Sequence, residues 1–127
     1  MSSSEDIICK DPSPYLGQWR GESKECVALP KDLGENMRNF ATYMWKRGLH
    51  VQSNYDQIAQ FTAIATFEAP NNKYLGHAAI FDKCDSEGIW VYDQWNARPV
   101  NYRRLNWDNT SGNGISNNGS KFYTIRR

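Results

Sequence analysis

The feature that most constrains the fold is a run of five strand-like segments in the second half of the chain. Each segment is rich in β-branched and aromatic residues, and turn-forming Pro, Asn, Gly and Asp separate them. The segments cover residues 62–67, 77–81, 89–95, 100–107 and 121–126. Because helix-like segments precede this run, the chain is predicted to be α+β, with N-terminal helices packed on an antiparallel sheet of about five strands.

Two helices are predicted before the strands. The first covers about 24–33, with Ser23 as N-cap and Gly34 as terminator, although Pro30 favours a start nearer Cys26 or a kink. The second covers 39–47, where apolar residues recur with helical spacing. Residues 1–14 are polar and predict a mobile arm, which leaves 15–127 as a single domain.

Charge and hydropathy exclude several partners. Fifteen basic and fourteen acidic residues give a net charge of +1, without the strongly basic face of a nucleic-acid binder, and the pairs Arg103-Arg104 and Arg126-Arg127 are interpreted as surface charge. No apolar run approaches the roughly 20 residues of a membrane helix. The N-terminus lacks the apolar segment of a signal peptide, so either export does not use the general route or a signal has been removed.

Cys26 and His77 are the candidate catalytic residues. Cys26 lies at or near the start of the first predicted helix, where free N–H groups and partial positive charge favour a thiolate and an oxyanion. A buried, inert cysteine is the alternative. Of the two histidines, His50 follows Gly48 in a predicted loop, whereas His77 opens a strand. His77 is therefore the expected base of a Cys–His dyad.

Asp93 is the candidate third residue, because of the predicted hairpin between 77–81 and 89–95. A symmetric hairpin that pairs Phe81 with Ile89 also pairs His77 with Asp93, and opposed residues share a face. Asp93 would then orient the imidazole. A register slip of one residue would place Gln94 or Tyr92 there instead.

Six segments together resemble a known family. They are ECVAL (25–29), TAIATF (62–67), GHAAIF (76–81), GIWVYDQW (88–95), YRRLNW (102–107) and FYTIR (122–126). Their order and spacing resemble the second family of type VI secretion amidase effectors, and also the domesticated amidase effectors of arthropods, including those of ticks. The resemblance extends over about residues 15–126.

The resemblance implies a papain-like NlpC/P60 fold and no metal or cofactor. It implies a secreted, antibacterial monomer that hydrolyses stem-peptide crosslinks of bacterial peptidoglycan, between meso-diaminopimelate and D-alanine. A bacterial effector would instead be delivered to the target periplasm and would have a cognate immunity protein. The family's nucleophile corresponds to Cys26, its base to His77 and its third polar residue to Asp93. The candidates for the oxyanion site and substrate contact are Tyr15, Gln94 and Trp45.

The two remaining cysteines are predicted to form a disulfide. Cys9 lies in the polar arm and Cys84 in a polar loop, and a bond between them would leave Cys26 as the free thiol. Two free surface thiols are the alternative. Asn109 and Asn118 begin glycosylation acceptor patterns, which agrees weakly with secretion.

Two other functions remain open at this point. One is a non-catalytic module on the same fold, whose tryptophan-rich groove would bind peptidoglycan without cutting it. The other is a general cysteine protease. Digestion of purified sacculi separates all three hypotheses.

Overall fold

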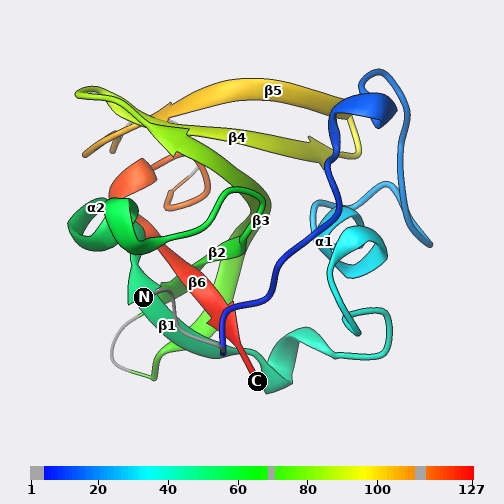
Figure 1. Cartoon of the computed structure of the whole chain (residues 1–127), viewed down its shortest axis with the longest axis horizontal. Helices are drawn as coiled ribbons and strands as arrows, with labels where there is room; N and C mark the ends of the chain where they lie inside the picture. The colour runs from blue at the N-terminus through cyan, green and yellow to red at the C-terminus, as the bar shows by residue number, and fades with distance from the viewer. Residues whose placement is uncertain (1–4, 69–70, 111–113) are drawn as a thin grey trace.

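The computed structural model describes residues 5–68, 71–110 and 114–127. Within these ranges six strands form one sheet in the order β1-β6-β2-β3-β4-β5 (Figure 1). The strands are β1 (Lys46–His50), β2 (Ala63–Glu68), β3 (Lys73–Cys84), β4 (Gly88–Trp95), β5 (Arg98–Asn106) and β6 (Phe122–Arg126). All neighbours in the sheet are antiparallel, so the α+β prediction is confirmed, with one strand more than expected.

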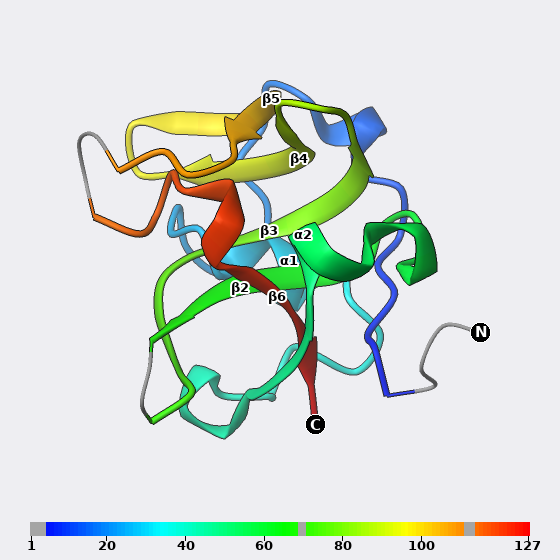
Figure 2. The same cartoon turned by 90° about the vertical axis from the view of Figure 1, so that its left-hand side faces the viewer.

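Short helices cover the sheet. They are α1 (Ala28–Leu33) and α2 (Val51–Asn54), together with the 3-10 helices η1 (Ser13–Tyr15), η2 (Thr42–Met44), η3 (Tyr55–Gln57) and η4 (Gly119–Lys121). Figures 1 and 2 show α1 and α2 on opposite sides of the layer formed by β2, β3 and β6. Both faces of this layer are therefore buried.

Two apolar clusters lie on the two faces, and the side chains of β3 alternate between them. Ala78 and Ile80 belong to the cluster that contains Leu29 of α1. Ala79 and Phe81 belong to the cluster on the side of α2. This alternation is the geometry of a strand. Because both faces of β3 are buried, the segment HAAIF is apolar at nearly every position.

The helix α1 begins later than residue 24, and its late start accommodates Pro30. Val27 is the N-cap and Ala28 the first helical residue, so Pro30 lies in the first turn. An N–H at that position has no partner within the helix, and its loss is tolerated there. Cys26 consequently lies in the turn just before α1.

The predicted helix at 39–47 is wrong. Residues 42–44 form the single turn η2, and Lys46 begins β1, which pairs with β6. Tyr43 is 82% exposed whereas Trp45 is 4% exposed, which is not the burial pattern of a helical apolar stripe. Gly48 allows close approach to the Thr124 hydroxyl, because a Cβ at this position would overlap that hydroxyl oxygen.

The N-terminal segment, expected to be an arm outside the domain, contributes to the core from residue 5 onward. Ile7 is 1% exposed, and its carbonyl accepts the Ala63 N–H at 2.8 Å. Asp6 forms a bridge with Arg126, and its carboxylate accepts hydrogen bonds from that guanidinium and from the Thr124 hydroxyl. The segment therefore contacts β6 and the start of β2, two adjacent inner strands of the sheet. This ion pair also shows that Arg126 is not simply a surface charge.

Candidate active site

The candidate site lies where the turn before α1 meets the start of β3 and the end of β4. A cavity of about 460 Å³ opens there, and its wall includes Cys26, Tyr74, His77 and Trp95. Gly76 has a φ of +108°, and a Cβ at this position would lie 2.7 Å from the Thr66 hydroxyl oxygen. The β2–β3 ladder is irregular at this point, and such an irregularity re-aims the next side chain, which is His77.

His77 and Asp93 form a buried hydrogen-bonded pair. The His77 Nε2 is 2.7 Å from the Asp93 Oδ2, and the two residues are 6% and 0% exposed. The predicted pairing of Phe81 with Ile89 is wrong by two residues, because Phe81 pairs with Val91. A shift of two preserves the face of every side chain. Asp93 therefore still reaches His77.

Asp93 is held by β5 as well, which the sequence analysis missed. Arg103 donates from Nη2 and Nε to the Asp93 Oδ2 at 2.8 and 3.0 Å, and the Asn101 amide donates to Oδ1 at 3.1 Å. Asp93 pairs with Asn101 across the β4–β5 ladder. A register prediction for this second hairpin would have found Asn101. The interpretation of Arg103 as surface charge is wrong. Arg104 does lie at the surface, where it forms an ion pair with Glu87.

The charges of the site support a thiolate beside an imidazolium. Burial lowers the pKa of His77, but hydrogen bonds and charge from Asp93 and Cys26 outweigh it and raise this pKa to about 9. Burial raises the pKa of Cys26, but interaction with His77, the Tyr74 hydroxyl and the Ala78 N–H holds it below its ordinary value. The pKa of Asp93 is also low, because bonds from His77 and Arg103 outweigh burial.

Tyr74, from the start of β3, lies beside Cys26, whereas Tyr15, the tyrosine expected at the oxyanion site, does not line the Cys26 cavity. The Tyr74 hydroxyl lies 3.6 Å from the Cys26 sulfur. Burial and the Cys26 charge raise the pKa of Tyr74, so the hydroxyl keeps its proton and donates a hydrogen bond to the thiolate. Tyr15 lies in η1, outside the wall of the Cys26 cavity, with the Arg20 guanidinium over its ring. The sequence analysis missed Tyr74 because the strand was expected to begin at His77.

Gln94 and Trp45 are both buried behind the cavity wall. The Gln94 amide donates to the carbonyls of Arg20 and Glu25 at 2.9 and 3.0 Å and accepts the Arg20 N–H at 2.8 Å. Gln94 thus ties the loop that leads to Cys26 onto β4. Trp45 packs edge-on against Tyr74, with ring centroids 5.0 Å apart. Each residue supports a residue of the site and neither lines the Cys26 cavity.

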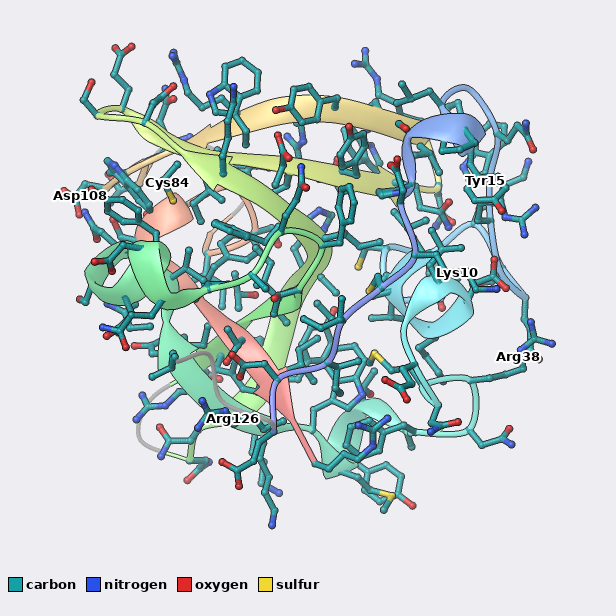
Figure 3. The ribbon with its side chains drawn as sticks, in the orientation of Figure 1. Lys10, Tyr15, Arg38, Cys84, Asp108 and Arg126 are labelled. Carbon is teal, nitrogen blue, oxygen red and sulfur yellow. The ribbon has the colours of Figure 1, made fainter. Side chains whose placement is uncertain are left out.

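The predicted disulfide is absent: Cys9, Cys26 and Cys84 are all free thiols. Cys9 is 6% exposed in the α1-side cluster, while Cys84 packs against the opposite cluster. Figure 3 shows Cys84 far from Lys10, the neighbour of Cys9. Burial raises the pKa of both thiols to about 12. The polar residues around Cys9 in sequence concealed its place in the core.

Asn118 is a structural residue. It is 5% exposed, and its side chain accepts the Ser120 N–H at the start of η4. Burial leaves no room for a glycan there. The pattern at Asn109 includes residue 111, which lies outside the described residues.

The described part of the chain contains no helix long and apolar enough to cross a membrane. Residues 5–68, 71–110 and 114–127 also contain no group of three or more His, Cys, Asp or Glu that could hold a metal ion.

Comparison with known proteins decides the family. The model of the family "Domesticated amidase effector 2" matches residues 1–125. The chain belongs to this family. It is 55% identical over 121 residues to a domesticated amidase effector 2 of Ixodes scapularis, covering 94% of the chain and 84% of the relative.

Bacterial relatives of this domesticated amidase effector family are also similar to the chain. A type VI secretion amidase effector 2 protein of Salmonella typhi is 37% identical over 78 residues, covering 59% of the chain and 56% of that protein. A solved structure of a type 6 secretion amidase effector 2 superposes with a TM-score of 0.75 at 26% identity, covering 94% of both chains. These similarities confirm the resemblance seen in the sequence and make the chain an amidase effector.

Proposed function

We propose that the chain is a cysteine amidase that hydrolyses stem-peptide crosslinks of bacterial peptidoglycan. The observation that carries the proposal is the alignment of Cys26, His77 and buried Asp93, with 2.7 Å between the His77 Nε2 and the Asp93 Oδ2. Because Nε2 is bonded to Asp93, the other ring nitrogen of His77, Nδ1, is the one that can interact with Cys26. Nucleophile, base and orienting carboxylate are the parts that acyl transfer requires.

The reaction follows from these roles. The Cys26 thiolate attacks the amide carbonyl carbon, and the His77 imidazolium gives its proton to the leaving amine nitrogen. The C–N bond breaks and a thioester forms. Neutral His77 then takes a proton from water, whose oxygen attacks the thioester and releases the carboxylic acid. Cys26 and His77 return to the ion pair, and the Asp93 carboxylate holds the ring throughout.

The family supports the substrate and setting. We assign the scissile bond to the meso-diaminopimelate–D-alanine crosslink, from the resemblance to the second effector family. The 55% identity to the Ixodes scapularis protein favours the domesticated branch. We therefore infer a secreted antibacterial monomer, and an immunity protein has no part in the proposal.

Digestion of purified sacculi tests the proposal. We expect the wild-type protein to convert crosslinked muropeptides to monomers, and Cys26→Ala to lose this activity with its circular dichroism unchanged. Loss by a factor of 10⁴ or more is on the order expected for removal of a nucleophile. Cys84→Ala is the matched thiol control and should retain activity.

The alternatives predict other outcomes. A non-catalytic binding module would sediment with sacculi but release no fragments. A general cysteine protease would also digest an unfolded protein such as casein. Full activity of Cys26→Ala would disprove the assignment of the nucleophile.

A further inference from the structure

A second cavity, of about 610 Å³, adjoins the Cys26 cavity. The two share Glu25 and Val27, the residues on either side of Cys26 in the chain. The second cavity is therefore within reach of a peptide whose amide lies at Cys26. The charged residues of its wall are Arg20, Glu22, Glu25, Lys31, Asp32 and Arg38.

Arg20 is immobilised at this wall by several contacts. Its backbone N–H and carbonyl are both bonded to Gln94, and its Nε donates to the Asp32 Oδ2 at 3.1 Å. Its guanidinium carbon lies 4.2 Å from the centroid of the Tyr15 ring. The two Nη groups make no hydrogen bond to the described residues. A guanidinium fixed in this way is preorganised to bind a carboxylate with both Nη groups.

The local charge favours an anion at Arg20. Asp32 accepts from Arg20 through one oxygen and from Arg38 through the other, at 3.0 Å, and only 9% of its side chain is exposed. Two guanidinium groups thus share one carboxylate, so the triad carries an excess positive charge. Glu22 and Glu25 elsewhere on the wall suit an ammonium group. Walls of both signs fit a zwitterionic amino-acid unit better than a simple anion.

We propose that this second cavity is a substrate subsite in which Arg20, assisted by Arg38, binds a free carboxylate of the peptidoglycan stem peptide. The subsite rests on the proposed function for the identity of its ligand. Stem peptides present carboxylates that some bacteria convert to carboxamides, and a carboxamide offers no charge to a guanidinium. The subsite therefore favours unamidated walls.

Binding in the Cys26→Ala background tests the subsite independently of cleavage. The probes are a purified crosslinked muropeptide dimer and the same dimer after chemical amidation of its carboxyl groups. We expect calorimetry to show about 10-fold weaker binding of the amidated dimer, as for loss of a charge-assisted hydrogen bond. Arg20→Gln should weaken binding of the carboxylate dimer by about the same factor and leave binding of the amidated dimer unchanged.

Further variants separate recognition from folding. Arg38 is 65% exposed at its side chain, so Arg38→Gln should fold and lose the same discrimination in part. In Figure 3 Arg38 lies at the outer edge of the molecule on the α1 side. Arg104→Gln, on β5, is the control and should bind both dimers as before. Equal binding of both dimers, or equal loss for both in Arg20→Gln, would overturn the subsite. Absence of cleavage by the wild-type protein would instead overturn only the proposed reaction.

Discussion

The chemistry of single residues here depends on neighbours more than on residue type. The three cysteines have the same thiol side chain but different surroundings. Burial raises the pKa of Cys9 and Cys84 to about 12. His77 and Tyr74 hold the pKa of Cys26 below its ordinary value. A thiolate is the reactive form. Only Cys26 is therefore suited to attack a carbonyl at neutral pH.

The pKa of His77 sets an alkaline limit to the proposed activity and to the stability that this residue contributes. Its folded value of about 9 lies above the ordinary 6.5, so its contribution to stability is complete below about 6.5 and is lost as pH rises through about 9. In the proposed mechanism the His77 imidazolium gives its proton to the leaving amine, and His77 loses this proton over the same pH range. We expect kcat/KM on crosslinked muropeptides to fall above pH about 9.

A variant of Asp93 tests this assignment. Asp93→Asn removes the charge that holds the imidazolium, so the alkaline limb should move to lower pH. A pH–rate profile of both proteins measures the shift. A limb that stays near 9 in Asp93→Asn would assign it to a group other than His77.

At the scale of elements, β4 organises the site from both of its faces. Asp93 orients His77, while the next residue, Gln94, ties down the loop before Cys26. Alternate residues of a strand point to opposite faces. One strand thus positions both the proposed base and the proposed nucleophile, and β5 supports it through Arg103 and Asn101.

The support from β5 gives a matched pair of variants, since Arg103 and Arg104 are adjacent. Arg103→Met leaves buried Asp93 with fewer donors and should cost about 1–3 kcal/mol of unfolding free energy. It also removes a cation near His77, so the alkaline limb should move to higher pH. Arg104→Met, at the exposed pair with Glu87, should change stability by no more than about 0.5 kcal/mol and leave the limb in place.

Denaturant titration and pH–rate profiles measure both effects. The role assigned to Arg103 requires that the two variants differ. If both variants have the same unfolding free energy and the same alkaline limb, the Arg103 guanidinium does not stabilise the Asp93 carboxylate as proposed.

At the scale of the whole molecule, the sequence predicted what is local and missed what depends on distant pairing. The strands that became β2 to β6 were visible from composition and turns. The contact between Asp93 and His77 was predicted despite a register error of two residues, because that error preserves the face. The strand β1 was missed because its partner β6 lies about 80 residues away in the sequence, and a short apolar pattern there reads equally well as a helix.

Tyr74 was missed for a related reason. It becomes a neighbour of Cys26 only when β3 is extended beyond its apolar part and the turn before α1 folds against it. Burial of the N-terminal segment was equally hidden, since its polar residues resemble those of a mobile arm. Contacts of this kind are properties of the folded molecule, not of a local sequence pattern.

The N-terminal segment offers the sharpest test of the whole fold, because two identical residues stand side by side in it. Ile7 is 1% exposed within the α1-side cluster, whereas Ile8 is 40% exposed. Ile7→Ala should lower the free energy of unfolding by about 2–5 kcal/mol, the range for deleting a buried isoleucine side chain. Ile8→Ala removes the same atoms from the surface and should cost no more than about 0.5 kcal/mol. Urea titration followed by tryptophan fluorescence measures both. Equal, small effects would mean that the segment is an arm after all, and that the sheet closes without it.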